Sequence, residues 1–174
     1  MPNWHAFTLK ANGGVLRVLQ TSCAICLGHD PASPPDPVPQ FCEFQAIWDT
    51  GATNCVITQA VVNACGLQPI GMVQSHGAHG VQMVPVFLVN LRLPNGVSFP
   101  VIRVSLGDLP HESQVLIGMD VIAMGDFAVT NEGGITWFSY RIPAQAHIDY
   151  VAVHNEKVRK AKFSHGQKKK GKKR

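Results

Sequence analysis

The chain has 174 residues, of which 45% are hydrophobic and 15% are charged. This length and balance fit one globular domain with a buried core, and they exclude a largely disordered chain. The net charge of +4 hides an asymmetry, because residues 1–156 carry a net charge of −6 and residues 157–174 carry +10. We therefore predict a globular body that is followed by a separate basic segment.

Neither a membrane-spanning segment nor a secretory signal is expected. No apolar run reaches the length that crosses a bilayer, and the first seven residues lack the basic and apolar regions of a signal peptide. The five cysteines cannot all pair within one chain, because their number is odd. We therefore expect a cytoplasmic protein with reduced thiols and no membrane partner.

Most of the chain predicts short strands separated by turns that are rich in glycine and proline. Residues 1–12 show little pattern, residues 14–27 predict one or two strands, and the proline-rich residues 29–40 predict a surface loop between two strands of one sheet. The elements expected next are a strand over 41–48, a strand over 54–58, a helix over 59–65, a hairpin over 71–93, a strand over 97–104, a strand over 114–117, a helix over 119–124, and a hairpin with arms 127–130 and 135–141. Apolar residues between 148 and 158 recur at helical spacing, and residues 167–174 predict a disordered basic tail.

Two short segments carry chemical information. Asp49-Thr50-Gly51-Ala52 follows an apolar strand, which would deliver the carboxylate of Asp49 to its end, and Gly51 is expected to let the backbone turn sharply there. Downstream, Leu116-Ile117-Gly118-Met119 places apolar residues before a glycine and a short helix. A turn of the first kind exposes a carboxylate that its own hydroxyls and amides can hold.

Together these segments resemble the retropepsin-like aspartic proteases, and the sequence looks closer to cellular and bacterial members than to retroviral ones. The resemblance covers roughly residues 13–143. It implies an all-β fold, a retropepsin-like closed β-barrel with a flap hairpin and short helices, followed by a C-terminal helix and basic tail. The implied division is a protease domain over residues 1–143 and an appended segment over residues 144–174.

The resemblance implies an aspartic endopeptidase that acts on polypeptides and needs no cofactor or metal. Peptide hydrolysis of this kind uses two carboxylates, and the chain has one Asp-Thr-Gly, so the second carboxylate would be Asp49 of another copy in a homodimer. Thr50, Gly51 and Ala52 would support the loop, with the Thr50 hydroxyl bonding across the dimer. The residues expected to form a flap over the substrate are His76, Gly77, Ala78, His79 and Gly80.

Two features of this region need separate comment, the flap histidines and the residues at positions 53 and 119. His76 and His79 are either exposed loop histidines or contacts to substrate. Retroviral enzymes usually carry an Asp–Arg ion pair at the positions of Thr53 and Met119, so this chain must hold its loop in another way. Both members are replaced together, which leaves no unpaired charge.

Two competing interpretations concern other ligands. Cys23, Cys26, His29 and Cys42 could supply a zinc site, but residues three apart on a strand point to opposite faces, so small buried side chains are favoured. The fold could also serve as a non-catalytic peptide-binding or polyanion-binding scaffold, with the basic tail binding a polyanion weakly. The intact Asp49-Thr50-Gly51 favours an enzyme.

Overall fold

The structure, a computed structural model, describes residues 5–77 and 80–170 and is dominated by strands. The strands are β1 His5–Lys10, β2 Gln20–Leu27, β3 Cys42–Trp48, β4 Val56–Ile57, β5 Gly71–Gly77, β6 Gly80–Arg92, β7 Ser98–Leu106, β8 Val115–Ile117, β9 Asp126–Thr130 and β10 Trp137–Ile142. The helices are α1 Gln59–Ala64, α2 Met119–Ile122 and α3 Tyr150–Lys170, with a 3-10 turn η1 at Glu132–Gly134. The all-β class and the order of strands, hairpins and short helices predicted from the sequence are confirmed.

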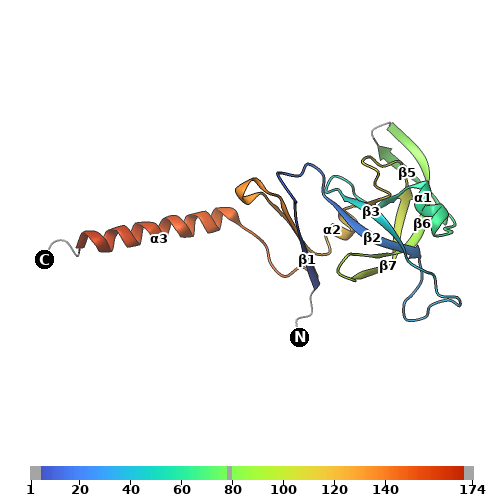
Figure 1. Ribbon diagram of the computed structural model, residues 1–174, viewed down its shortest axis with the longest axis horizontal. Coiled ribbons are helices and arrows are strands. Elements are labelled where there is room, and N and C mark those ends of the chain that lie inside the picture. Colours follow the sequence, from blue (N-terminus) through green and yellow to red (C-terminus); the bar gives the residue numbers. More distant parts are fainter. Residues whose placement is uncertain (1–4, 78–79, 171–174) are drawn as a thin grey trace.

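Strand pairings close most of the body into a ring. The larger sheet runs in the order β2-β3-β8-β4-β7-β6-β5, and β2 also pairs with β6. The ring therefore consists of β2, β3, β8, β4, β7 and β6, while β5 pairs only with β6 and extends the sheet as the outer arm of a hairpin. Figure 1 shows this hairpin projecting beyond the rest of the body.

The position of β8 is the unusual feature of the ring. β8 lies between β3 and β4, pairing parallel with β3 and antiparallel with β4. The loop that joins β3 to β4 must therefore pass over the end of β8, which arrives from much later in the chain. All three residues of β8 are buried, as expected for a strand covered on both faces.

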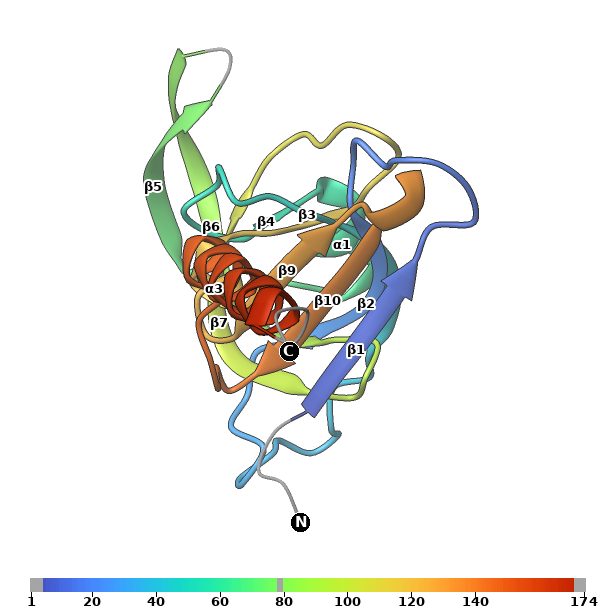
Figure 2. The same ribbon diagram turned by 90° about the vertical axis from the view of Figure 1, so that its left-hand side faces the viewer.

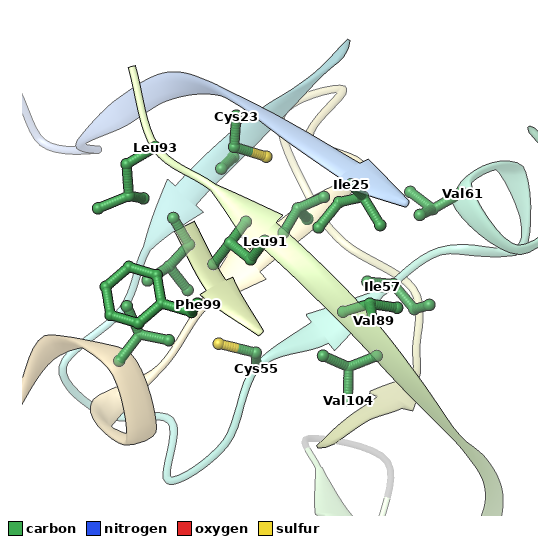
Figure 3. Close-up of a cluster of buried hydrophobic side chains, with 14 of the residues drawn as sticks. Cys23, Ile25, Cys55, Ile57, Val61, Val89, Leu91, Leu93, Phe99 and Val104 are labelled. Carbon is green, nitrogen blue, oxygen red and sulfur yellow. The ribbon is translucent and has the colours of Figure 1, made fainter. Parts of the chain in front are cut away.

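The core lies inside the ring. Figure 3 shows side chains from β2, β4, β6 and β7 pointing toward one another, among them Ile25, Ile57, Val89 and Val104. Each of these four side chains is at most 1% exposed. Burying an aliphatic side chain of this size contributes about 1.5–3 kcal/mol, so this cluster stabilises the ring that positions the loops at its ends.

A second sheet of three strands covers one end of the ring. Its order is β1-β10-β9, and Figure 2 shows the three strands side by side. Aromatic rings connect it to the body, with the Trp48 ring centroid 5.1 Å from those of both Phe138 and Tyr140. The Tyr140 hydroxyl donates to the Val121 carbonyl of α2 at 2.7 Å, and burial raises the pKa of this hydroxyl to about 12.

No pattern in the sequence indicated β1, and residues 5–10 are the clearest omission from the prediction. Phe7 is the only residue of β1 that is not exposed, and it packs edge-on against Phe138 with ring centroids 5.6 Å apart. A strand that buries one side chain has no alternating pattern from which it could be recognised. The second strand of the sheet, β10, lies where the predicted hairpin placed it.

The C-terminal helix α3 extends away from the body (Figure 1). Asp149 caps it by accepting the backbone N–H groups of Val151 and Ala152, each at 2.9 Å. The helix continues to Lys170, so the prediction of disorder was wrong for residues 167–170, because glutamine and lysine are good helix formers. Residues 171–174 of the predicted tail lie outside the described residues.

Every described side chain of α3 is exposed, including the apolar ones whose spacing predicted the helix. Within the described ranges no helix is both long enough and apolar enough to cross a membrane. The division into a domain over 1–143 and an appended segment over 144–174 stays a prediction. It is compatible with β10 ending at Ile142 and α3 beginning at Tyr150.

Candidate active site

The turn that carries Asp49 begins where β3 ends, and hydrogen bonds fix its shape. Oδ1 of Asp49 accepts the backbone N–H of Gly51 at 2.8 Å, and the Asp49 carbonyl accepts that of Ala52 at 3.3 Å. The backbone N–H of Asp49 donates to the Ile117 carbonyl of β8 at 3.0 Å. Asp49 and Ala52 are half-buried, whereas Thr50 and Gly51 are exposed. The turn therefore holds a carboxylate at the end of the ring without enclosing it.

A glycine at position 51 leaves room for the Asp49 carboxylate, and its backbone conformation is an ordinary one. It is not one of the glycines with positive φ, so the expected reason for a glycine here, conformational freedom, was wrong. A Cβ atom at this position would lie 3.1 Å from Oδ1 of Asp49. Any larger residue would press against the carboxylate that the turn presents.

The start of α2 holds the far half of the loop through backbone hydrogen bonds. The N–H of Met119 donates to the Ala52 carbonyl at 2.8 Å, and the N–H of Asp120 donates to the Thr53 carbonyl at 3.1 Å. Thr53 and Met119 are the positions where retroviral enzymes were expected to carry an ion pair. Here the same two segments are joined by main-chain groups, so the loop is held whichever side chains occupy those positions.

The side chain of Asp120 adds a second connection. Its Oδ2 accepts the backbone N–H of Cys55 at 2.9 Å, and its Oδ1 accepts the Cys55 thiol at 3.0 Å. Oδ1 also accepts the N–H of Val121 at 3.0 Å. Burial raises the pKa of the Cys55 thiol, and the adjacent Asp120 carboxylate raises it further. Cys55 therefore stays protonated and donates to Asp120, which commits this carboxylate to a structural contact.

Gly118 explains why a glycine follows the apolar residues of β8. A Cβ atom there would lie 2.7 Å from both the carbonyl carbon and oxygen of Asn54. Only a residue without a side chain lets α2 approach the loop closely enough for the hydrogen bonds from Met119 and Asp120. The N–H of Gly118 points to the Cys55 sulfur at 3.4 Å.

The hairpin of β5 and β6 matches the predicted flap in position. His76 pairs with Val81 and Gly77 with Gly80, which has a φ of +96°. The predicted substrate-contacting residues Ala78 and His79 lie outside the described residues, as does the side chain of His76. The role assigned to this tip therefore stays a prediction.

A cavity of about 410 Å³ lies between the loop, β5 of the hairpin, and the neighbouring strands. Its described lining consists of Gly51, Ala52, Thr53, Asn54, Val56, Val73, Gln74, Ser75, Val86, Arg103, Val104 and Ser105. Asp49 does not line this cavity, which begins two residues after it. The cavity therefore flanks the carboxylate instead of containing it.

The four residues considered for zinc are spread over different surroundings. Cys23 belongs to the main core cluster, whereas Cys26, equally buried, lies outside it. His29 Nδ1 lies 2.9 Å from the carbonyl oxygen of Leu27. The Cys42 sulfur lies 3.8 Å from the carbonyl oxygen of Ala64. In the described part of the chain no three His, Cys, Asp or Glu side chains are grouped as metal ligands would be.

Sequence reasoning missed two residues of this region. Asp120 and Arg103 were counted only as parts of the helix expected over 119–124 and of the strand expected over 97–104. A lone arginine within the apolar and β-branched run of β7 was the available signal for the second. The contact between Asp120 and Cys55 had no local signal, because 65 positions separate the two residues.

Comparison with known proteins gives one family and several structural similarities. Residues 42–121 match the family described as aspartyl protease. No curated protein sequence matches the chain. Among solved structures, a retropepsin-like aspartic protease from Rickettsia conorii is 12% identical, with 82% of this chain and 98% of that chain covered and a TM-score of 0.45. The EIAV protease complexed with the inhibitor HBY-793 is 16% identical over 65% of this chain and 92% of its own, with a TM-score of 0.46.

A third similar structure is the retroviral protease-like domain of Ddi1 from Leishmania major. It is 16% identical, with 71% of this chain and 95% of that chain covered and a TM-score of 0.41.

The connection between Asp120 and Cys55 predicts a measurable loss of stability. Asp120→Ala should lower the free energy of unfolding by about 2–3 kcal/mol, because it leaves the Cys55 N–H without its acceptor. Urea unfolding followed by tryptophan fluorescence measures this change. Asp108→Ala, at an exposed carboxylate, should change the value by less than about 0.5 kcal/mol. Equal effects of the two substitutions would contradict the assigned role of Asp120.

Proposed function

We propose that this chain, whose residues 42–121 match the aspartyl protease family, is an endopeptidase that hydrolyses polypeptides as a homodimer. One observation carries the proposal. The Asp49 turn presents a single hydrogen-bonded carboxylate beside a cavity, and the nearest carboxylate of α2, Asp120, is already engaged by Cys55. The odd number of cysteines supports the additional proposal of a cytoplasmic location.

The need for a homodimer follows from the number of available carboxylates. Asp120 is bound through both of its oxygens, and no carboxylate is among the described residues that line the cavity. A two-fold axis beside the turn would place Asp49 next to Asp49 of a second copy. Thr50 is exposed, which leaves its hydroxyl available for the contact across the dimer that the family resemblance implies.

The proposed chemistry divides two roles between identical residues. Two adjacent carboxylates repel each other when both are ionised, so the pair holds one shared proton. The ionised Asp49 removes a proton from a water molecule, whose oxygen attacks the peptide carbonyl carbon. The protonated Asp49 donates to the carbonyl oxygen, and collapse of the tetrahedral intermediate returns a proton to the departing nitrogen.

The hairpin of β5 and β6 supplies the remaining part of the proposal. It extends from the ring beside the cavity and projects past the body (Figures 1 and 2). We assign it the role of a flap that closes over a bound peptide and excludes water. His76, Gly77, Ala78, His79 and Gly80 would then contact the substrate backbone, as the sequence suggested.

Asp49→Asn should abolish peptide cleavage, with a loss of at least about a thousandfold in kcat/KM, because the amide cannot act as the general base. Cleavage of a mixed peptide library between acid and neutral pH, followed by mass spectrometry, measures it. Asp108→Asn, which changes an exposed carboxylate in the same way, should keep the wild-type rate. Wild-type cleavage by Asp49→Asn would disprove the catalytic assignment, and cleavage by neither protein would favour a non-catalytic scaffold.

The dimer predicts a particular result when two kinds of chain are mixed. If wild-type and Asp49→Asn chains are refolded together in equal amounts, random pairing leaves about a quarter of the dimers with two intact carboxylates. Activity per dimer should fall to about this quarter of the wild-type value, and dilution should lower it further. An activity of about one half would instead show that each chain holds a complete site.

A second candidate function concerns the basic helix. Lys157, Arg159, Lys160 and Lys162 are exposed on α3, which stands clear of the body in Figure 1, and residues 157–174 carry a charge of +10. Only Lys160 has an ion pair among the described side chains of α3, with Glu156 at 2.7 Å. We propose that this segment binds polyanions weakly by releasing their counterions.

Replacing the six Lys and Arg residues of 166–174 with Gln should weaken polyanion binding without changing the length of the chain. Fluorescence anisotropy with a labelled single-stranded oligonucleotide should show affinity that falls steeply with salt and a smaller salt slope in the variant. Cleavage of small peptides should be the same in both proteins. An unchanged affinity would contradict the role of the tail, and lost cleavage would mean that the tail belongs to the catalytic unit.

A further inference from the structure

We infer that Arg103 makes the cavity beside the Asp49 turn a binding pocket for an acidic side chain of the substrate. The inference rests on the proposed peptidase function, since it concerns which peptides that site accepts. It names a residue that would determine specificity and that the proposed catalytic chemistry does not use.

The placement of the cavity makes it a pocket for a residue near the cleaved bond. One wall is the stretch from Gly51 to Asn54, which continues directly from the catalytic turn. The opposite wall is the stretch from Val73 to Ser75 on β5, within the arm of the proposed flap. A peptide held between the turn and the hairpin would therefore direct one of its side chains into this space.

The lining of the cavity combines apolar walls with a single charge. Val56, Val73, Val86 and Val104 provide the apolar surface, and Arg103 is the only charged side chain among the described residues that line the cavity. Pockets of this kind use a few polar groups to fix the orientation and identity of the ligand. The guanidinium group presents several N–H donors in a plane, which matches the two oxygens of a carboxylate.

The other arginines of strands β6 and β10 already have acidic neighbours. Arg92 lies 3.7 Å from Glu43 and stacks on Phe41, and Arg141 donates to Asp126 at 2.8 Å. For Arg103 the described side chains include no such acid, and its side chain is exposed on β7. It therefore contributes a positive charge to the cavity that the fold itself does not neutralise.

Thr53 strengthens this conclusion. Thr53 and Arg103 line the same cavity, and retroviral relatives usually carry aspartate at the position of Thr53. In this chain Met119 offers no cation, so an acid at position 53 would compete with the substrate for Arg103. Threonine adds no negative charge to this wall of the cavity, and it therefore leaves Arg103 able to bind an acidic group of the peptide.

The test compares matched peptides that differ by Glu against Gln at single positions on either side of the cleaved bond. The wild-type enzyme should prefer Glu at one position by about five- to tenfold in kcat/KM, and added salt should reduce the preference. Arg103→Met should remove this preference by lowering kcat/KM for the Glu peptide more than for the Gln peptide. Arg103→Lys should retain part of it, and Thr53→Asp should weaken it.

Arg17→Met is the matched control, because Arg17 is an exposed arginine that does not line the cavity. It removes the same charge and should keep the full Glu preference. Arg103→Glu should reverse the selectivity, so that a Lys peptide is cleaved better than a Glu peptide. A Glu preference that survives Arg103→Met, or that Arg17→Met removes equally, would overturn the inference.

Binding without cleavage separates this inference from the proposed function. The Asp49→Asn protein should bind a fluorescent Glu peptide about five- to tenfold more tightly than the Gln peptide, and the added substitution Arg103→Met should equalise the two. If the wild-type protein cleaves nothing but shows this binding difference, the peptidase proposal fails and the acidic pocket stands. If the wild-type protein cleaves both peptides at equal rates and the Asp49→Asn protein binds them equally, the peptidase proposal stands and the acidic-side-chain pocket is disproved.

Discussion

The insertion of β8 between β3 and β4 is the constraint on which the site depends. Because β3 and β4 do not pair with each other, the loop between them must cross the end of β8, where Ile117 holds its first half and Met119 and Asp120 hold its second half. A strand buried on both faces tolerates no polar residue, which accounts for the sequence Val115-Leu116-Ile117. The position of Asp49 is therefore fixed by hydrogen bonds from a segment that is distant in sequence and packed within the core.

The chain replaces an expected ion pair with contacts of a different kind. A buried Asp–Arg pair must recover the cost of removing two charges from water, and losing one member leaves an unpaired charge. The present arrangement uses two backbone hydrogen bonds and one carboxylate that accepts from an amide and a thiol. Only one charge is partly buried, and the protonated Cys55 helps to satisfy it. This solution leaves the side chains of Thr53 and Met119 free to vary for other purposes.

Local patterns in the sequence predicted the parts of the fold whose causes are local. The Asp49 turn follows an apolar strand directly, and the helix α1 lies within the segment 59–65 that its local sequence predicted. A glycine stands at position 96, where the chain turns with a φ of +83°. β1 escaped notice because only Phe7 is partly buried, and α3 ran further than its apolar spacing suggested. These two errors arise because burial by other segments and helix propensity both act beyond the hydrophobic pattern.

The candidate site likewise has a part that local sequence predicted and a part that only the tertiary structure shows. Its motif could be read from consecutive residues, but the surroundings of that motif depend on the closed ring. Arg103 and Ser75 become neighbours of Thr53 only because β5, β6 and β7 wrap around to the loop. No spacing rule links these positions, so the charge of the pocket could be found only from the three-dimensional arrangement.

The length and exposure of helix α3 would affect how the protein binds a large polyanion. With 21 residues and a rise of about 1.5 Å for each, it is a spacer of roughly 30 Å between the body and the most basic end of the chain. The homodimer proposed above would carry two such spacers, so two weak contacts to one polyanion would act together, the second at a high effective concentration once the first has formed. Such a dimer would be retained on a polyanionic assembly while its proposed active site stays accessible to proteins held on the same assembly.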